Sequence, residues 1–219
     1  MTFGGVILDH VMIGITAATS VAAGSVEVFL RYTRYGFFAL TGFVLTYQYR
    51  HRSLEPISFW RRRFKLIGLP FVTWTLFYWL YGRYRIGGLE TLKGIVADQH
   101  SMATAAKSIG YDLITGNAMY HLYFLSVSMQ IYLFFPLILA ILKRTWGFHR
   151  YQLIVSFAIQ VTLMYLMVRP PLDIFADGVG GVIWTHLVIT IFPYQFFILA
   201  GCVAAMHYEA FQAFVIRWR

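Results

Sequence analysis

Long apolar runs alternate with short polar stretches along the whole chain. About 20 apolar residues in a helix suffice to cross the hydrocarbon core of a bilayer. The pattern predicts six membrane-spanning helices, over Phe3–Ala22, Tyr35–Tyr49, Leu66–Tyr81, Met119–Leu142, Tyr151–Val168 and Trp184–Met206. Strict two-residue alternation is not seen, so we expect an all-α, polytopic transmembrane helical bundle rather than a barrel.

The composition excludes an ordinary soluble domain. Of the 219 residues, 59% are hydrophobic and only 12% are charged, whereas a typical soluble domain has about 25% charged residues. A soluble chain of this length could not cover so much apolar surface, because much of any small domain faces water. We therefore expect the protein in the cell membrane, with the lipid bilayer as its first partner.

Basic residues collect in blocks between the apolar runs and account for a net charge of +9. The stretch 50–65 is the richest, and the stretch 143–150 and the C-terminal end hold further Lys and Arg. Cytoplasmic loops are enriched in these residues, so six spans predict a multi-pass protein with both termini in the cytoplasm. Anionic lipids and cofactors are favoured as partners, and no nucleic acid is expected.

The longest polar stretch, Gly82–Ala118, falls on the opposite side of the membrane in this topology. We expect it to hold one short amphipathic element, around Leu89–Ala106.

Histidines within or beside the predicted spans are the first candidates for chemistry. His10 follows Asp9 about 10 Å into the first predicted span, and ionisable groups at such depth are often functional. A histidine hydrogen-bonded between two helices is an equal alternative. His121 opens the fourth predicted span with Ser128 on the same helix face, and an interfacial anchor with a wet polar tip is its alternative.

The densest charge in the chain is the block Phe59–Lys65, with sequence FWRRRFK. Membrane topology alone would explain it. The functional alternative is a cradle for phosphate groups, because Arg side chains bind phosphate oxygens in a bidentate manner. Its four basic residues are Arg61, Arg62, Arg63 and Lys65. Pro70 follows at the expected start of the third span, where a proline suits the first turn of a helix.

Thr41 precedes Gly42 in the second predicted span. A glycine beside a small hydroxyl residue permits close approach of two helices in a membrane. Packing is therefore the more common reason for this pair.

Four strings in this order resemble the acyltransferase family 3 membrane proteins. They are a histidine in the first span (His10), an aromatic run ending in Thr-Gly-Phe (Gly36–Phe43), the aromatic and basic block that runs into a proline (Phe59–Pro70), and a His-Leu-aromatic-Phe-Leu string leading to Pro136 (His121–Leu125). Together they extend over most of the chain.

The resemblance implies a membrane-bound enzyme that moves an acyl group from acyl-CoA, with acetyl-CoA as the expected donor, to a hydroxyl of a carbohydrate or lipid-linked acceptor. Such enzymes modify polysaccharides and other components of the cell envelope. The basic block would hold the coenzyme phosphates, His10 would be the general base, and Thr41 and His121 would stabilise the oxyanion. No metal is expected.

The chain departs from the family pattern in three respects. The arginine usual eleven positions before the first-span histidine would fall at position −1, and Leu66 stands where a second arginine often follows the basic block. Family members usually have about ten spans. We therefore expect residues 1–219 to form one membrane-embedded domain that is incomplete at its C-terminus and at its N-terminus.

Two other functions remain open. Some family relatives are described as exporters, so the protein could export or flip a polysaccharide or lipid. A non-catalytic, truncated remnant is the third interpretation.

Overall fold

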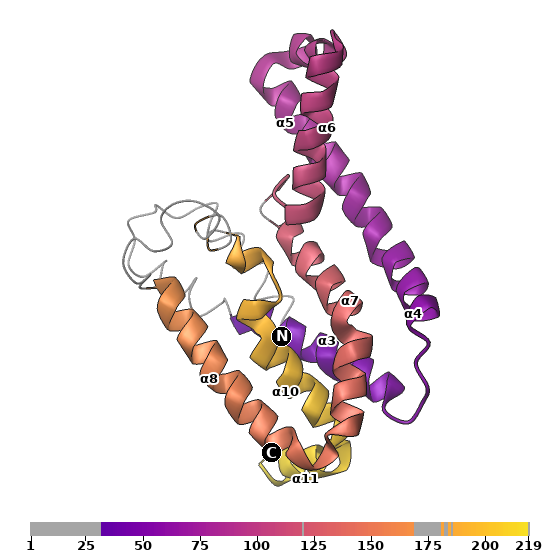
Figure 1. Cartoon of the computed structure of the whole chain (residues 1–219), viewed down its shortest axis with the longest axis vertical. Helices are drawn as coiled ribbons and strands as arrows, with labels where there is room; N and C mark the ends of the chain where they lie inside the picture. Colours follow the sequence, from indigo (N-terminus) through magenta and orange to yellow (C-terminus); the bar gives the residue numbers. More distant parts are fainter. Residues whose placement is uncertain (1–31, 120, 169–180, 182–183, 185, 219) are drawn as a thin grey trace. The chain divides into compact units, whose positions relative to one another are not determined.

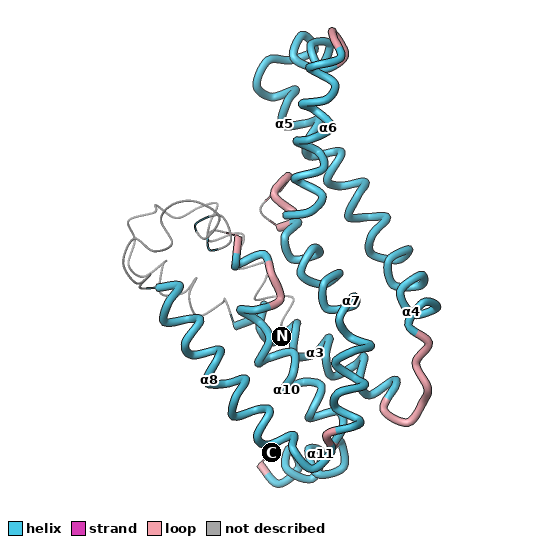
Figure 2. The backbone as a smooth tube through the Cα atoms, in the orientation of Figure 1, coloured by secondary structure: helices cyan, strands magenta, loops and turns pink. Residues whose placement is uncertain are grey.

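The structure, a computed structural model, describes residues 32–119, 121–168, 181, 184 and 186–218. All regular secondary structure in these residues is helical, which confirms the expected all-α fold (Figure 2). The first predicted span, with Asp9 and His10, lies outside the described residues. The chain divides into two compact units. One takes residues up to Ser53, Leu139–Tyr165 and Tyr194–Arg219, and the other takes Leu54–Ile138 and Leu166–Pro193.

In the first unit, helices α3 and α10 lie side by side (Figure 1). Two glycines make this contact possible. A Cβ atom on Gly201 would lie 1.9 Å from the carbonyl oxygen of Ala39, and one on Gly42 would lie 2.5 Å from that of Ile198. The packing role expected for Gly42 is therefore confirmed. The helices of this unit are α3 (Tyr32–Tyr49), α8 (His149–Val168), α10 (Gln195–Met206) and α11 (Tyr208–Arg217), with the 3-10 turn η2 (Trp146–Phe148) before α8.

The second unit contains a helical hairpin of α5 and α6, visible in Figure 1. The bounds of the short element expected around Leu89–Ala106 were wrong. The backbone is non-helical at Gly87 and Gly88, α5 then continues to Ile95, and a separate helix starts at Gln99. Asp98 caps that second helix by accepting a hydrogen bond from the Ser101 backbone N–H at 2.8 Å. The helical elements of this unit are α4 (Pro56–Arg63), the π-turn η1 (Phe64–Gly68), α5 (Leu69–Ile95), α6 (Gln99–Thr115) and the larger part of α7 (Leu122–Arg144).

Residues 186–194 of the sixth predicted span do not form a regular α-helix. Before α10 the chain forms two 3-10 turns, η4 (Leu187–Ile189) and η5 (Phe192–Tyr194). Gln130 of α7 holds the intervening backbone: its amide donates to the Ile189 carbonyl at 2.8 Å, and its Oε1 accepts from the Ile191 N–H at 3.0 Å. Irregular backbone at membrane depth needs such partners, because lipid provides none.

Two described helices are long and apolar enough to cross a membrane, Leu122–Arg144 and Trp146–Met167. They correspond to the fourth and fifth predicted spans. A third would be the pair Phe192–Met206 and Tyr208–Arg217, which is bent by 97°. The other predicted spans, and therefore the number of six, stay predictions.

Candidate active site

The basic block ends α4 and enters the π-turn η1. The side chains of Arg61, Arg62 and Lys65 are exposed, whereas Arg63 is half-buried. The guanidinium carbon of Arg63 lies 5.7 Å from the ring centroids of both Phe59 and Tyr132. These are cation–π contacts, so one arginine of the block packs against α7 while its neighbours remain available to a ligand.

A hydrogen bond fixes the block to α7, at a backbone carbonyl that a proline leaves without its usual helical donor. Pro136 lies inside α7 and has no N–H, so it cannot donate to the carbonyl four residues earlier, that of Tyr132. The indole Nε1–H of Trp60 donates to this carbonyl at 3.0 Å. Phe59, which is 4% exposed, packs beside it with its ring centroid 5.5 Å from that of Phe135. The basic block is therefore in direct contact with the part of α7 that precedes Pro136.

Pro70 lies in the first turn of α5, as the sequence analysis expected, but the chain before it is helical too. Gly68, just before α5, has helical φ and ψ angles of −64° and −39°, and α4, η1 and α5 follow one another without a break. A proline ring inside a helix clashes with the carbonyl four residues earlier. The wider π-turn Phe64–Gly68 lies directly before Pro70, and π-turns of this kind are common at functional sites.

His121 lies in the turn that leads into α7 and is half-buried. Its ring packs edge to face on Tyr78 of α5, with 5.2 Å between the centroids. Tyr132 lies eleven positions further along the chain, or about 16 Å along the helix axis. His121 and the basic block are thus at different levels of the same unit, and the structure does not bring them together.

Thr41 belongs to the first unit, and its hydroxyl donates to the Phe37 carbonyl of its own helix at 2.9 Å. Helical threonines commonly make this bond to the preceding turn. His10, the expected base, lies outside the described residues. Of the expected site residues within the described chain, Arg61, Arg62 and Lys65 have exposed side chains, whereas His121 packs on Tyr78 and Thr41 bonds to its own helix.

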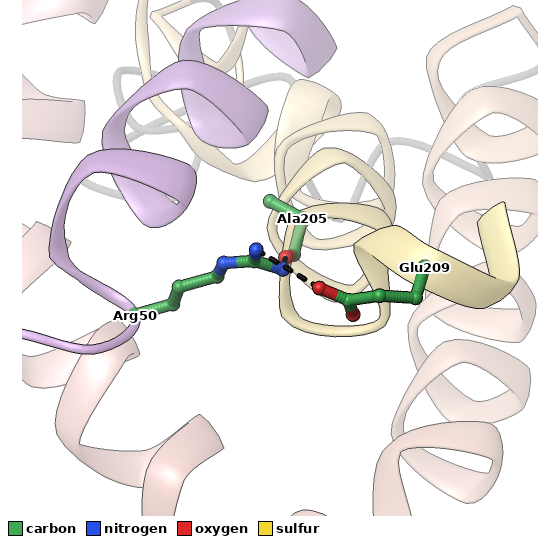
Figure 3. Close-up of polar contacts among 3 residues, drawn as sticks. All are labelled: Arg50, Ala205 and Glu209. Carbon is green, nitrogen blue, oxygen red and sulfur yellow. Dashed lines mark hydrogen bonds and ion pairs between the residues drawn. The ribbon is translucent and has the colours of Figure 1, made fainter. Parts of the chain in front are cut away.

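A different arginine is engaged within the protein. Arg50, at the end of α3, donates to the Ala205 carbonyl at 3.3 Å and pairs with the Glu209 carboxylate at 3.0 Å (Figure 3). Its guanidinium carbon also lies 4.7 Å and 5.2 Å from the ring centroids of Tyr47 and Tyr208. This arginine therefore joins α3 to the C-terminal end of α10 and to α11.

Sequence analysis missed a pair of histidines in the first unit. His149 Nδ1 and His207 Nε2 are 2.8 Å apart, and His149 Nε2 lies 2.9 Å from the Leu142 carbonyl oxygen. The carbonyl can only accept, so His149 Nε2 carries a proton and, in the neutral pair, His207 donates to His149. No spacing signal could have found this pair, because 58 residues separate the two rings.

His207 lies between α10 and α11, outside both helices. Partial burial, and to a smaller degree the neighbouring His149, lower the pKa of His207 from 6.5, while Glu209 opposes the shift. The imidazole is consequently held in its neutral form at neutral pH.

Comparison with known protein families identifies the chain. The family model described as "Acyltransferase domain" matches residues 2–219. No curated protein and no solved structure gives a significant match. The matched residues include all the strings that carry the resemblance, and they include both Trp60 and the proline-containing helix α7 that it contacts. The chain therefore belongs to the acyltransferase family 3 membrane proteins.

Proposed function

We propose that this membrane acyltransferase transfers an acyl group from acyl-CoA to a hydroxyl of a carbohydrate or lipid-linked acceptor, with acetyl-CoA as the first donor to test. The observation that carries the proposal is the state of Arg61, Arg62 and Lys65. All three side chains are exposed, and among the described residues none of them pairs with a carboxylate. They are therefore free to bind the phosphates of the coenzyme.

The surroundings of the block support this role. The Trp60 hydrogen bond and the packing of Phe59 fix the end of α4 on α7, so the arginines project from a rigid helix. A guanidinium group binds phosphate oxygens through two parallel hydrogen bonds. Positioning by rigid elements reduces the entropy that is lost on binding.

In the proposed reaction, His10 takes the proton of the acceptor hydroxyl. The acceptor oxygen attacks the thioester carbonyl, the new C–O bond forms, the C–S bond breaks, and the coenzyme thiolate takes up the proton. His121 and Thr41 are proposed to stabilise the oxyanion. For Thr41 this would require its hydroxyl to turn away from the Phe37 carbonyl that it now contacts. The proposed topology has both termini in the cytoplasm, on the side of the basic block.

The test is acyl transfer by the purified protein in lipid nanodiscs, with acetyl-CoA and a panel of carbohydrate and lipid-linked acceptors. We expect Arg61→Gln/Arg62→Gln to raise the KM for acetyl-CoA about 100-fold, since each charge-assisted hydrogen bond contributes about 1.5 kcal/mol. Arg85→Gln is the matched control, because Arg85 is exposed on α5 of the same unit, outside the block. An equal rise in KM for both variants would refute a specific phosphate site.

Two further measurements separate the roles. His10→Ala should abolish transfer while acetyl-CoA binding persists, and retained transfer would remove the proposed base. Acceptor flux across the membrane without acyl-CoA, with no acyl product, would favour the exporter over the transferase.

A further inference from the structure

A groove runs along one face of α8 in the first unit, with a volume of about 430 Å³. It is unrelated to the basic block, which belongs to the other unit. The residues that line it are Phe148, Tyr151, Gln152, Val155, Ser156, Ile159 and Gln195.

The polar groups at the base of the groove are engaged with one another. The Ser156 hydroxyl donates to Gln195 Oε1, and Gln195 Nε2 donates back to the Ser156 carbonyl at 2.8 Å. Gln152 Nε2 donates to the Thr145 hydroxyl at 2.9 Å. Within the described residues the Gln152 Oε1 accepts no hydrogen bond, but it is buried. The other groups are paired within the protein, so the surface that they leave to an occupant is largely apolar.

The sides of the groove are apolar and open. Tyr151 is 50% exposed, Val155 58% and Ile159 47%. All three residues lie on a helix that is long and apolar enough to span the membrane. From Phe148 to Ile159 the helix rises about 16 Å. Half of the hydrocarbon core of a bilayer is about 15 Å thick, so the groove has the length of one lipid chain in one leaflet.

A cation lies at the end of the groove where α8 begins. Arg150 donates to the Tyr151 hydroxyl at 2.9 Å, and its guanidinium carbon is 4.6 Å from the centroid of that ring. One of the five N–H groups of the guanidinium is used in this bond. The others can bind the phosphate of a lipid whose chain enters the groove.

From this geometry we propose that the α8 groove binds one acyl chain of an anionic phospholipid, with the lipid phosphate on Arg150. The charge of Arg150 complements the phosphate, and the apolar side chains between Tyr151 and Ile159 complement the chain. The site is independent of the proposed acyl transfer, because it needs neither acyl-CoA nor an acceptor.

The test is native mass spectrometry of the detergent-purified protein, titrated with phosphatidylglycerol or with phosphatidylcholine of the same chains. We expect Val155→Trp to fill the groove and lower the bound fraction of both lipids about tenfold. Arg150→Gln should lower the affinity for phosphatidylglycerol about tenfold and leave that for phosphatidylcholine unchanged.

Two matched variants distinguish a site from general attraction to the membrane. Val161 is 50% exposed on the same helix but does not line the groove, so Val161→Trp should retain the lipid. Arg144→Gln removes an exposed charge from the last turn of α7 and should retain the preference for phosphatidylglycerol. Equal losses for Val155→Trp and Val161→Trp, or for Arg150→Gln and Arg144→Gln, would overturn the proposal. Melting temperatures measured without added lipid identify any variant that has lost its fold.

Discussion

Arg50 and the pair Arg61–Arg62 come from the same basic stretch of the sequence, yet their surroundings differ. Arg50 contacts a carbonyl, a carboxylate and two aromatic rings of its own unit. Arg61 and Arg62 lie exposed at the end of α4, and within the described chain they take part in no ion pair. Charge density therefore does not tell a structural cation from one that can bind a ligand.

The comparison extends to the two units that hold these residues. In the first unit, glycine contacts, the Arg50 cluster and the histidine pair connect helices to one another. In the second, the Trp60 bond orients a helix whose basic side chains remain exposed. Changes in the first unit should therefore affect stability, and changes in the block should affect ligand affinity.

The largest expected loss of stability comes from Gly201→Val. A Cβ atom there would overlap the Ala39 carbonyl oxygen, so α3 and α10 would have to separate. We expect a loss of about 3 kcal/mol or more, at the upper end for overpacked cores, seen as a large fall in melting temperature. Gly82→Ala is the control, since no atom lies within 4 Å of its Cβ position; if it behaved like Gly201→Val, close helix contact would not be the cause.

The next largest effect is expected for Trp60→Phe. It leaves the Tyr132 carbonyl without a donor, because Pro136 has no N–H to replace the indole. The expected cost is about 1–3 kcal/mol. Adding Pro136→Ala restores a helical N–H to that carbonyl, so the double variant should lose less than the sum of the two single variants. A strictly additive result in this cycle would contradict the link between the two residues.

A smaller loss is expected for Arg50→Gln, about 1 kcal/mol from the hydrogen bond to the Ala205 carbonyl. The exposed ion pair with Glu209 should add little. The KM for acetyl-CoA should not change, in contrast to the variant of Arg61 and Arg62. If KM rose as steeply for Arg50→Gln, the distinction between structural and ligand-binding arginines would fail.

The smallest expected effect is the dependence of stability on pH. The pKa of His207 is lower in the folded protein than its usual 6.5, so the unfolded chain binds the proton more readily. Acidification below about pH 6.5 should therefore destabilise the fold, and stability should recover as the pH rises. His207→Asn should flatten this part of the melting-temperature profile. An unchanged profile would assign the pH dependence to other groups.

The apolar runs predicted α7 and α8 well. Membrane helices satisfy their backbone hydrogen bonds within one segment, so local composition specifies them. The elements outside such runs were less predictable. The sequence analysis placed one short element where the α5–α6 hairpin lies, because that stretch mixes polar and apolar residues and its helices gain from packing on each other.

For the candidate site, too, local features were predictable from the sequence and contacts between distant residues were not. The basic block and its aromatic neighbours were found from sequence as a dense local string. The histidine pair, the Arg50 cluster and the Gln130 contact to the Ile189–Ile191 backbone were not found, because each joins residues at least 58 positions apart.

By itself the sequence determined that this protein is a helical membrane protein of acyltransferase family 3 with a basic block between its apolar runs. Only the tertiary structure decided which cations that block leaves available, how the helix continues through Pro70, and which donor meets the carbonyl freed by Pro136. The physical reason is that hydrophobicity and charge act within one segment, whereas a buried donor needs an acceptor that another segment brings to it.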